Sequence, residues 1–349
     1  MAAAQLLDSA EDMLSERKLN EALDYYIRAE SAGADRERCA GGKWLVHMLR
    51  GDFPAAWDES DTTRSLHRPD PNCLWRGEAI NDKRVVVRCL HGFGDAVQFF
   101  RYAPQLNAVA EKVVWQVPPE MVDIATYFPG VGQAITWRQE GSDFTDWDVQ
   151  IECMELPNIF RTHLRELPIA TNYLRLPTDL IEAIDKQMGR SSEPRIGLVW
   201  AAGEWNRSRS IPLELLHPML QSSGCEFWNL QGGAERASGS ALPKHLELRD
   251  AKPCNGGVLQ LAGVISQLDL VITVDTLAAH LAGALGVPAW VLLQYAADWR
   301  WMVHRVDSPW YPSLRLFRQP SPGDWGSVVR EVEESLLNWV EAEAERMAA

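Results

Sequence analysis

The stretch LDLVITVDTLAAHLAGALGVPAWVLL, residues 268–293, decides the fold class. Residues 270–274 are a continuous apolar and β-branched run, which is typical of a strand buried on both faces. A helix is predicted over Thr276–Leu285, because a glycine and then a proline follow its last residue. A second apolar run, residues 289–293, comes directly afterwards. The order strand, helix, strand predicts an α/β fold with a parallel sheet covered by helices.

The same alternation occurs in two series along the chain. In the first series, strands are predicted at Val85–Leu90, Lys112–Val117, Ile135–Trp137 and Val149–Ile151, with helices at Asp95–Val109 and Met121–Phe128. A polar helix is predicted at Leu180–Arg190, before the second series begins. In the second series, further strands are predicted at Arg195–Trp200 and Glu226–Gln231, with helices at Leu213–Gln221 and Val258–Ser266. Two successive series predict two Rossmann-like domains, over residues 67–190 and 191–325, that face each other across a ligand-binding cleft. A long acidic helix is expected to fill the C-terminal segment 326–349.

The N-terminal segment, residues 1–66, has a helical and repetitive pattern. Leu19–Asp24 aligns with Phe53–Asp58, and the two copies start 34 residues apart, which is the period of a tetratricopeptide (TPR) repeat. Only about one and a half such repeats fit, fewer than the three that are usually stable alone. We therefore expect a TPR-like helical segment that docks on the rest of the protein. The alternative is a helical hairpin with chance similarity.

Composition excludes several classes of protein. The net charge of −14 over 349 residues opposes binding to nucleic acid, although it allows one small phosphate ligand in a local positive pocket. The N-terminus lacks a secretory signal, and no apolar stretch is long enough to span a membrane. The six cysteines are scattered without a CxxC pair, which argues against a zinc site and a disulfide framework. We expect reduced thiols in a cytoplasmic protein.

The strongest candidate site lies where the strand 270–274 ends. Asp275 and Thr276 open the following helix, whose first amides lack partners within the helix and, with the helix dipole, favour an anion. Thr276 and His280 are four residues apart and share one helical face. This face predicts a diphosphate site. The alternative is structural, because Asp and Thr are common helix caps and a single histidine is often a satisfied polar residue.

A second candidate site is the turn His91-Gly92-Phe93-Gly94-Asp95, which follows a predicted strand. Gly92 and Gly94 allow the backbone to approach a ligand closely. The third glycine of a dinucleotide fingerprint is missing. Asp95 is interpreted either as a general base or as a helix N-cap.

Two further segments have the composition of ligand contacts. The loop 200–212 contains Arg207 and Arg209, and a guanidinium offers a planar fork of donors to phosphate. A solvated loop is the alternative. The segment 298–311 is dense in Trp, Arg and His, which suits either a platform for stacking a base or sugar, or packing between the domains.

Four segments carry a resemblance to a known family: GFGDAVQFFRYAP (92–104), RIGLVWAAGEWNRSRSIPL (195–213), LDLVITVDTLAAHLAGALGVPAW (268–290) and DWRWMVHRVDSPWYPSLRLFRQPSPGDW (298–325). With them the chain resembles bacterial TPR-linked proteins similar to glycosyltransferase family 9, the heptosyltransferase group, and more distantly the protein O-GlcNAc transferases. The resemblance implies a GT-B fold. It also implies an inverting, metal-independent glycosyltransferase without a cofactor, which moves a sugar from a nucleoside-diphosphate sugar to an acceptor hydroxyl on a glycan or protein.

The resemblance also assigns roles to residues. It places the contacts to the nucleoside diphosphate at Asp275, Thr276 and His280, a phosphate contact at Arg209, and the catalytic base at Asp95. The chain departs from the family pattern in three motifs, which here read HGFGD, AAGEWN and NLQGG. In the last of these, a lysine that contacts phosphate in the pattern SLQKG is absent.

Two alternative functions stay open at this point. The first is a nucleotide-sugar epimerase of the same architecture, which needs no acceptor. The second is a catalytically idle relative that serves as an interaction module through its helical segment. The nucleotide (UDP, ADP or GDP), the sugar and the acceptor are left open by the sequence.

Overall fold

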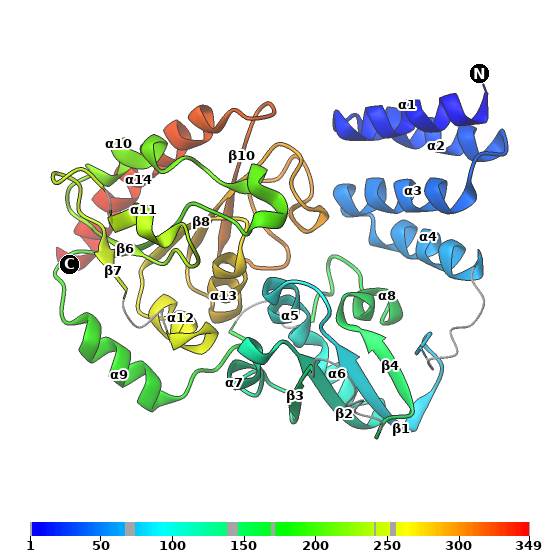
Figure 1. Ribbon diagram of the computed structural model, residues 1–349, viewed down its shortest axis with the longest axis horizontal. Coiled ribbons are helices and arrows are strands. Elements are labelled where there is room, and N and C mark those ends of the chain that lie inside the picture. The colour runs from blue at the N-terminus through cyan, green and yellow to red at the C-terminus, as the bar shows by residue number, and fades with distance from the viewer. Residues whose placement is uncertain are drawn as a thin grey trace.

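The protein has three parts, which Figure 1 shows in sequence order from blue to red. The computed structural model describes residues 2–66, 74–137, 146–168, 172–240, 242–251 and 256–348. A helical segment comes first. A four-stranded sheet with its helices follows, and then a six-stranded sheet with its helices.

The helical segment consists of two helical hairpins. Its helices are α1 (Ala3–Ser15), α2 (Leu19–Ser31), α3 (Arg36–Arg50) and α4 (Phe53–Leu66). α2 and α4 begin at the two aligned positions, and the small residues Ala22 and Ala56 in them are fully buried. Small residues let neighbouring helices approach, and Gly42 of α3 does the same for the ring of Tyr26.

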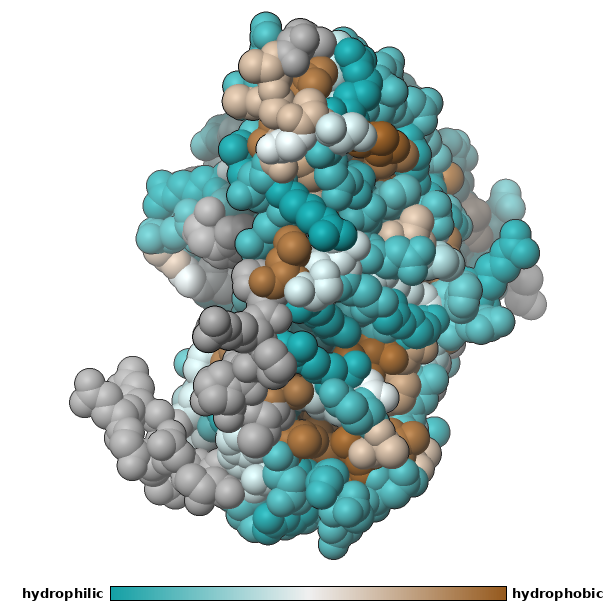
Figure 2. Space-filling model, turned by 90° about the vertical axis from the view of Figure 1, so that its right-hand side faces the viewer, coloured by the Kyte–Doolittle hydropathy of each residue, from teal (hydrophilic) through white to brown (hydrophobic). Residues whose placement is uncertain are grey.

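This segment packs on the rest of the protein, as expected. The Trp57 indole N–H donates to the carbonyl of Thr162 at 2.9 Å. The amide of Val303 donates to the carbonyl of Leu49 at 3.0 Å. These bonds join helices α3 and α4 to both of the α/β halves. Figure 2 shows the outer side of this region, which is mostly hydrophilic with apolar residues in small separate patches.

The first sheet is parallel, with the strand order β3–β2–β1–β4. Its strands are β1 (Ile80–Arg88), β2 (Ala110–Val117), β3 (Ala134–Thr136) and β4 (Val149–Glu152). Its helices are α5 (Phe93–Phe99), η1 (Phe100–Tyr102), α6 (Ala103–Asn107), η2 (Pro119–Met121), α7 (Val122–Ala125), η3 (Cys153–Glu155) and α8 (Leu156–Ile159). The single helix predicted over 95–109 is wrong, because the chain tightens into a 3₁₀ turn before Pro104, which has no N–H for a helical bond.

The second sheet is also parallel, with the strand order β10–β9–β8–β5–β6–β7. Its strands are β5 (Arg195–Val199), β6 (Glu226–Asn229), β7 (Arg249–Asp250), β8 (Leu270–Val274), β9 (Ala289–Leu293) and β10 (Leu314–Arg318). If β5 is taken as the first strand of this half, β8 is the fourth, and the strand order is that of a Rossmann fold. In that fold the chain reverses its direction across the sheet between the first and fourth strands. The reversal point lies between β5 and β8, where such sheets bind ligands beyond the carboxyl ends of the strands.

The helices of the second half are α9 (Thr178–Met188), η4 (Glu204–Arg209), η5 (Leu213–Leu216), α10 (His217–Leu220), α11 (Arg236–Ser240), α12 (Val258–Ile265), α13 (Leu277–Leu285), η7 (Trp299–Trp301) and α14 (Trp325–Ala348). α12 and α13 pack on one face of the second sheet, and α10 and α14 pack on the other. α9 precedes β5 in the chain but packs on α12, where a Cβ at Gly263 would overlap Ile184. Among the described residues, no helix is both long and apolar enough to cross a bilayer.

The close packing of α2 on α3 generates a prediction with a matched control. A Cβ at Gly42 would lie 2.1 Å from the buried ring of Tyr26, whereas a Cβ at the adjacent Gly41 would meet nothing within 4 Å. We expect Gly42→Ala to lower the free energy of unfolding by about 1–3 kcal/mol through overpacking. We expect Gly41→Ala to raise it by about 0.5–1 kcal/mol, since alanine favours a helix. Urea denaturation measures both, and equal effects would contradict the observed packing.

Candidate functional site

Two helices from the two α/β halves pack directly against each other. α5 follows β1, α13 follows β8, and the two helices are in contact. Gly94 makes this possible, because a Cβ there would lie 2.5 Å from Cδ2 of His280. The glycine turn of the first half and the Asp-Thr turn of the second half therefore lie at one place, beyond the carboxyl ends of both sheets.

Asp95 is held by partners on both carboxylate oxygens. Its Oδ2 accepts the backbone N–H of Gly92 at 2.8 Å, which caps the start of α5. Its Oδ1 lies 2.5 Å from Nη2 of Arg300, which comes from the other half of the protein. The Asp95 side chain is 21% exposed, whereas that of Arg300 is 7% exposed. Asp95 is thus both a helix cap and one side of an ion pair between the halves.

Arg300 has three side-chain acceptors that surround its guanidinium. Besides Asp95, Nε donates to Oε1 of Gln98 at 2.8 Å and Nη1 donates to Oδ1 of Asp298 at 2.8 Å. The guanidinium carbon also lies 4.6 Å from the centre of the Trp299 ring. Burial opposes the charge, but Asp298 and Asp95 outweigh it and raise the pKa of Arg300 above its usual range. Arg300 is therefore a fixed, buried cation.

Arg209, Asp275 and Thr276 lie at the reversal point of the second sheet. Nη1 of Arg209 donates to the backbone carbonyl of Asp275 at 3.0 Å and lies 3.6 Å from its Oδ2. Burial, together with Asp298, raises the pKa of Asp275. Thr276 is the N-cap residue of α13, but its side chain does not cap the helix and instead lies 3.0 Å from the hydroxyl of Thr273. The backbone at this helix start and one arginine are thus close together.

His280 lies beneath this turn rather than on an open face. Only 5% of the residue is exposed, and its Nδ1 lies 2.9 Å from the hydroxyl of Tyr311. Burial lowers the pKa of His280 well below its ordinary value, and the cations of Arg300, Arg101 and Arg209 lower it further. A neutral imidazole therefore packs against Gly94 at the boundary between the halves.

A buried arginine at this boundary was not predicted from the sequence. Arg101 is 1% exposed, and it donates to the carbonyl of Trp310 and to the hydroxyl of Tyr173, both at 3.0 Å. The Tyr173 hydroxyl in turn donates to the carbonyl of Val97 at 3.1 Å. A signal was available, because Arg101 interrupts the apolar run FFRYA. A charged residue inside such a run is expected to have buried partners.

The Trp-rich segment 298–311 serves packing rather than an open stacking platform. Trp299, Trp301 and Trp310 are 8%, 1% and 0% exposed. Trp299 packs edge-on against Trp44 of the helical segment, with ring centres 5.8 Å apart. The segment was interpreted either as a platform for stacking a base or sugar or as a packing element. These three indoles serve packing.

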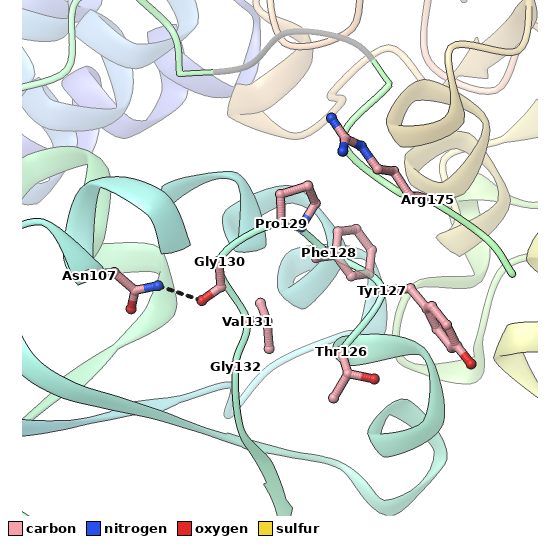
Figure 3. Close-up of a pocket in the computed structure, with 9 residues that line it drawn as sticks. All are labelled: Asn107, Thr126, Tyr127, Phe128, Pro129, Gly130, Val131, Gly132 and Arg175. Carbon is pink, nitrogen blue, oxygen red and sulfur yellow. Dashed lines mark hydrogen bonds between the residues drawn. The ribbon is translucent and has the colours of Figure 1, made fainter.

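A cavity of about 410 Å³ lies near the amino ends of the strands of the first sheet, whereas the α5–α13 contact lies beyond their carboxyl ends (Figure 3). It is lined by Asn107, residues 126–132 and Arg175, and the Asn107 amide donates to the carbonyl of Gly130 at 2.7 Å. Residues 126–132 lead into the start of β3, so the cavity is near the amino ends of the strands. None of the site residues predicted from the sequence lines it.

Comparison with known proteins identifies the fold. No family model matches the chain. The protein FlbA of Caulobacter vibrioides is 23% identical over 295 residues, which cover 77% of this chain and 49% of FlbA. The chain thus spans about half the length of this curated relative.

Two solved structures share the arrangement of both α/β halves. The glycosyl transferase family 9 protein of Veillonella parvula has a TM-score of 0.58 and 12% identity, over 76% of this chain and 98% of that chain. The ADP-heptose lps heptosyltransferase II of E. coli has a TM-score of 0.53 and 14% identity, over 75% of this chain and 99% of that chain. The expected α/β fold of GT-B type, with two parallel-sheet domains, is confirmed.

The buried state of His280 predicts a pH-dependent stability. Because its folded pKa is lowered, the unfolded chain binds this proton more readily, so the stabilising contribution is present above about pH 6.5 and is lost on acidification. We expect the free energy of unfolding to fall more steeply from about pH 7 to pH 5 in the natural protein than in His280→Gln, by up to about 1.4 kcal/mol per pH unit.

Chemical denaturation at several pH values measures this difference. The control is His245→Gln, since His245 is exposed. We expect the control to keep the pH slope of the natural protein. If His280→Gln also kept that slope, His280 would not be the buried neutral group that the structure shows.

Proposed function

We propose that this protein is an inverting, metal-independent glycosyltransferase that moves a sugar from a nucleoside-diphosphate sugar to an acceptor hydroxyl. One observation carries the proposal. The carboxyl ends of both sheets meet at the α5–α13 contact, with the carboxylate of Asp95 on one side and Arg209 with Thr276 on the other. The fold shared with family 9 glycosyltransferases supports it.

In this proposal the second half binds the donor. The start of α13 lies at the Rossmann reversal point, where backbone amides and the helix dipole favour a diphosphate. Arg209 would add a planar pair of donors, and Asp275 would orient that arginine through its carbonyl. His280 would support this turn from below as a neutral residue. The heptosyltransferase II of E. coli is named for ADP-heptose, and we propose a nucleotide sugar of that general class here.

The reaction in this proposal is a single in-line displacement. The acceptor oxygen attacks the anomeric carbon, the bond from that carbon to the diphosphate oxygen breaks, and Asp95 accepts the proton of the hydroxyl. The departing diphosphate gains negative charge, which Arg209 and the start of α13 would stabilise by preorganised electrostatics. Gly92 leaves room for the acceptor to reach Asp95, because a Cβ there would lie 3.2 Å from Oδ2 of Asp95. The space next to Gly94 is filled by His280, so Gly94 serves the contact between the helices. A positioned base of this kind contributes about 10²–10⁴ in rate.

The donor class is tested first, by a thermal-shift screen with ADP-, UDP- and GDP-sugars. A donor present at about 100 times its dissociation constant adds about 2.7 kcal/mol to the free energy of unfolding. We expect one nucleotide series to raise the melting temperature, with release of the nucleoside diphosphate when acceptor is supplied. A protein that no nucleotide or nucleotide sugar stabilises would contradict the proposed function.

The role of Asp95 is tested by Asp95→Asn. We expect turnover to fall at least about 100-fold, because the amide cannot accept the proton, with little change in the calorimetric affinity for the donor. The matched control is Asp82→Asn, since the Asp82 side chain is 81% exposed on the same sheet. Full activity of Asp95→Asn would remove Asp95 from the mechanism.

The role of Arg209 is tested by Arg209→Met. A lost hydrogen bond between charged groups costs about 1.5–3 kcal/mol, so we expect nucleoside-diphosphate affinity to fall by about 10- to 100-fold in calorimetry. Arg207→Met is the control, because the Arg207 side chain is 74% exposed and pairs with Glu204 in the same loop. Equal losses in the two variants would show that general charge, rather than this site, governs binding.

A further inference from the structure

One loop of the second half connects the helical segment to Asp95. We call residues 295–303 the bridging loop; it follows β9 and includes η7. The hydroxyl of Tyr295 donates to the carbonyl of Glu16 at 2.9 Å, and Nη2 of Arg17 donates to the carbonyl of Ala297 at 3.0 Å. Both Glu16 and Arg17 belong to the turn between α1 and α2. The start of the bridging loop is thus fixed by the first helical hairpin.

The second helical hairpin holds the rest of the bridging loop. Trp44 of α3 packs edge-on against Trp299, with ring centres 5.8 Å apart, and both rings are large apolar contacts. The carbonyl of Leu49, near the end of α3, accepts the amide of Val303 at 3.0 Å. The first hairpin therefore contacts the loop before Arg300, and the second hairpin contacts it both before and after Arg300.

A residue of the second sheet also holds the bridging loop. Nη2 of Arg318, at the end of β10, donates to the carbonyls of Trp301 at 3.1 Å and Met302 at 2.8 Å. Met302 has a φ of +51°, a conformation that a residue with a side chain adopts only where its surroundings hold it. The loop is therefore fixed in one conformation by neighbours from both directions.

The bridging loop places the guanidinium of Arg300 against the first half. Its donors reach Asp95 and Gln98 on α5 and Asp298 within the loop itself. Three separate acceptors need the rigid, forked geometry of a guanidinium, which a lysine does not provide. With the Gly92 amide on the other oxygen, Arg300 fixes the rotation of the Asp95 carboxylate.

We propose that Arg300 is the positioning residue for Asp95 and that the helical segment sets its position by holding the bridging loop. The catalytic part of this inference rests on the proposed function, whereas the mechanical link from the helices to α5 does not. A displacement of about 1 Å at a reacting group costs about 10²-fold in rate, so such support has a measurable kinetic effect.

The kinetic test compares Arg300→Met and Arg300→Lys, using the nucleotide sugar that the thermal-shift screen selects. We expect Arg300→Met to lower kcat about 100-fold with less than about a threefold change in donor KM, and Arg300→Lys to recover part of the loss. The control is Arg305→Met, because Arg305 forms an ion pair with Asp307 and lies outside the bridging loop.

The decisive comparison is the double variant Asp95→Asn with Arg300→Met. If Arg300 acts through Asp95, the double variant is no slower than Asp95→Asn alone. Losses that multiply would overturn the positioning role and leave Arg300 as a purely structural residue. Full activity of Asp95→Asn alone would instead overturn the proposed base, and the mechanical link would then be judged by the next measurement.

Hydrogen–deuterium exchange tests the mechanical link without any substrate. We expect Trp44→Ala, and the milder Arg17→Ala, to speed exchange in residues 295–303 and also in residues 92–98, which neither substitution touches directly. Arg28→Ala is the control, since Arg28 is half exposed on α2 and pairs with Asp24. We expect it to change neither segment. Faster exchange at 295–303 with unchanged protection at 92–98 would overturn the inference.

Discussion

The contact of α5 with α13 is the constraint on which the rest of the site depends. The two helices reach this separation only because residue 94 has no side chain, and the imidazole of His280 occupies the space that a Cβ would take. The contact brings the starts of both helices to one place, with Asp95 beyond β1 and Thr276 beyond β8. Each parallel sheet contributes its carboxyl edge, which is where α/β sheets bind ligands. The network of Arg101, Tyr173 and Tyr311 then holds the two halves together behind the contact.

The charge distribution at this boundary differs from that of the whole chain. The protein carries a net charge of −14, yet Arg101, Arg209 and Arg300 gather around His280, whose pKa is lowered first by burial and then by these cations. Burying these cations is unfavourable unless acceptors surround them, and the carboxylates of Asp95 and Asp298 and several backbone carbonyls fill that role. Because Asp95, Asp275 and Asp298 balance these arginines, the attraction for a diphosphate in our proposal comes from the amides at the start of α13 and from the Arg209 donors beside them.

The sequence predicted those parts of the fold that local patterns determine. β8 and β9 are found with their predicted bounds, because each is an unbroken apolar run between clear turn signals. β10 was not predicted, since its sequence LRLFR contains two arginines. Arg315 nevertheless lies over the ring of Phe317, 4.4 Å from its centre. β7 was not predicted either, because two residues carry no periodicity.

The predicted site residues all lie around the α5–α13 contact, but their partners could not be predicted from the sequence. Arg300 is 205 residues from Asp95, and nothing local specifies that pair.

A crystal structure with bound nucleoside diphosphate tests the central claim most directly. The ligand should be the nucleotide whose sugar gives the largest thermal shift, soaked or co-crystallised with the full chain. We predict that its diphosphate lies at the start of α13, within hydrogen-bonding distance of the backbone near Thr276 and of the Arg209 guanidinium. A nucleotide bound instead in the cavity lined by Asn107 and Arg175, with the start of α13 closed by packed side chains, would contradict the account.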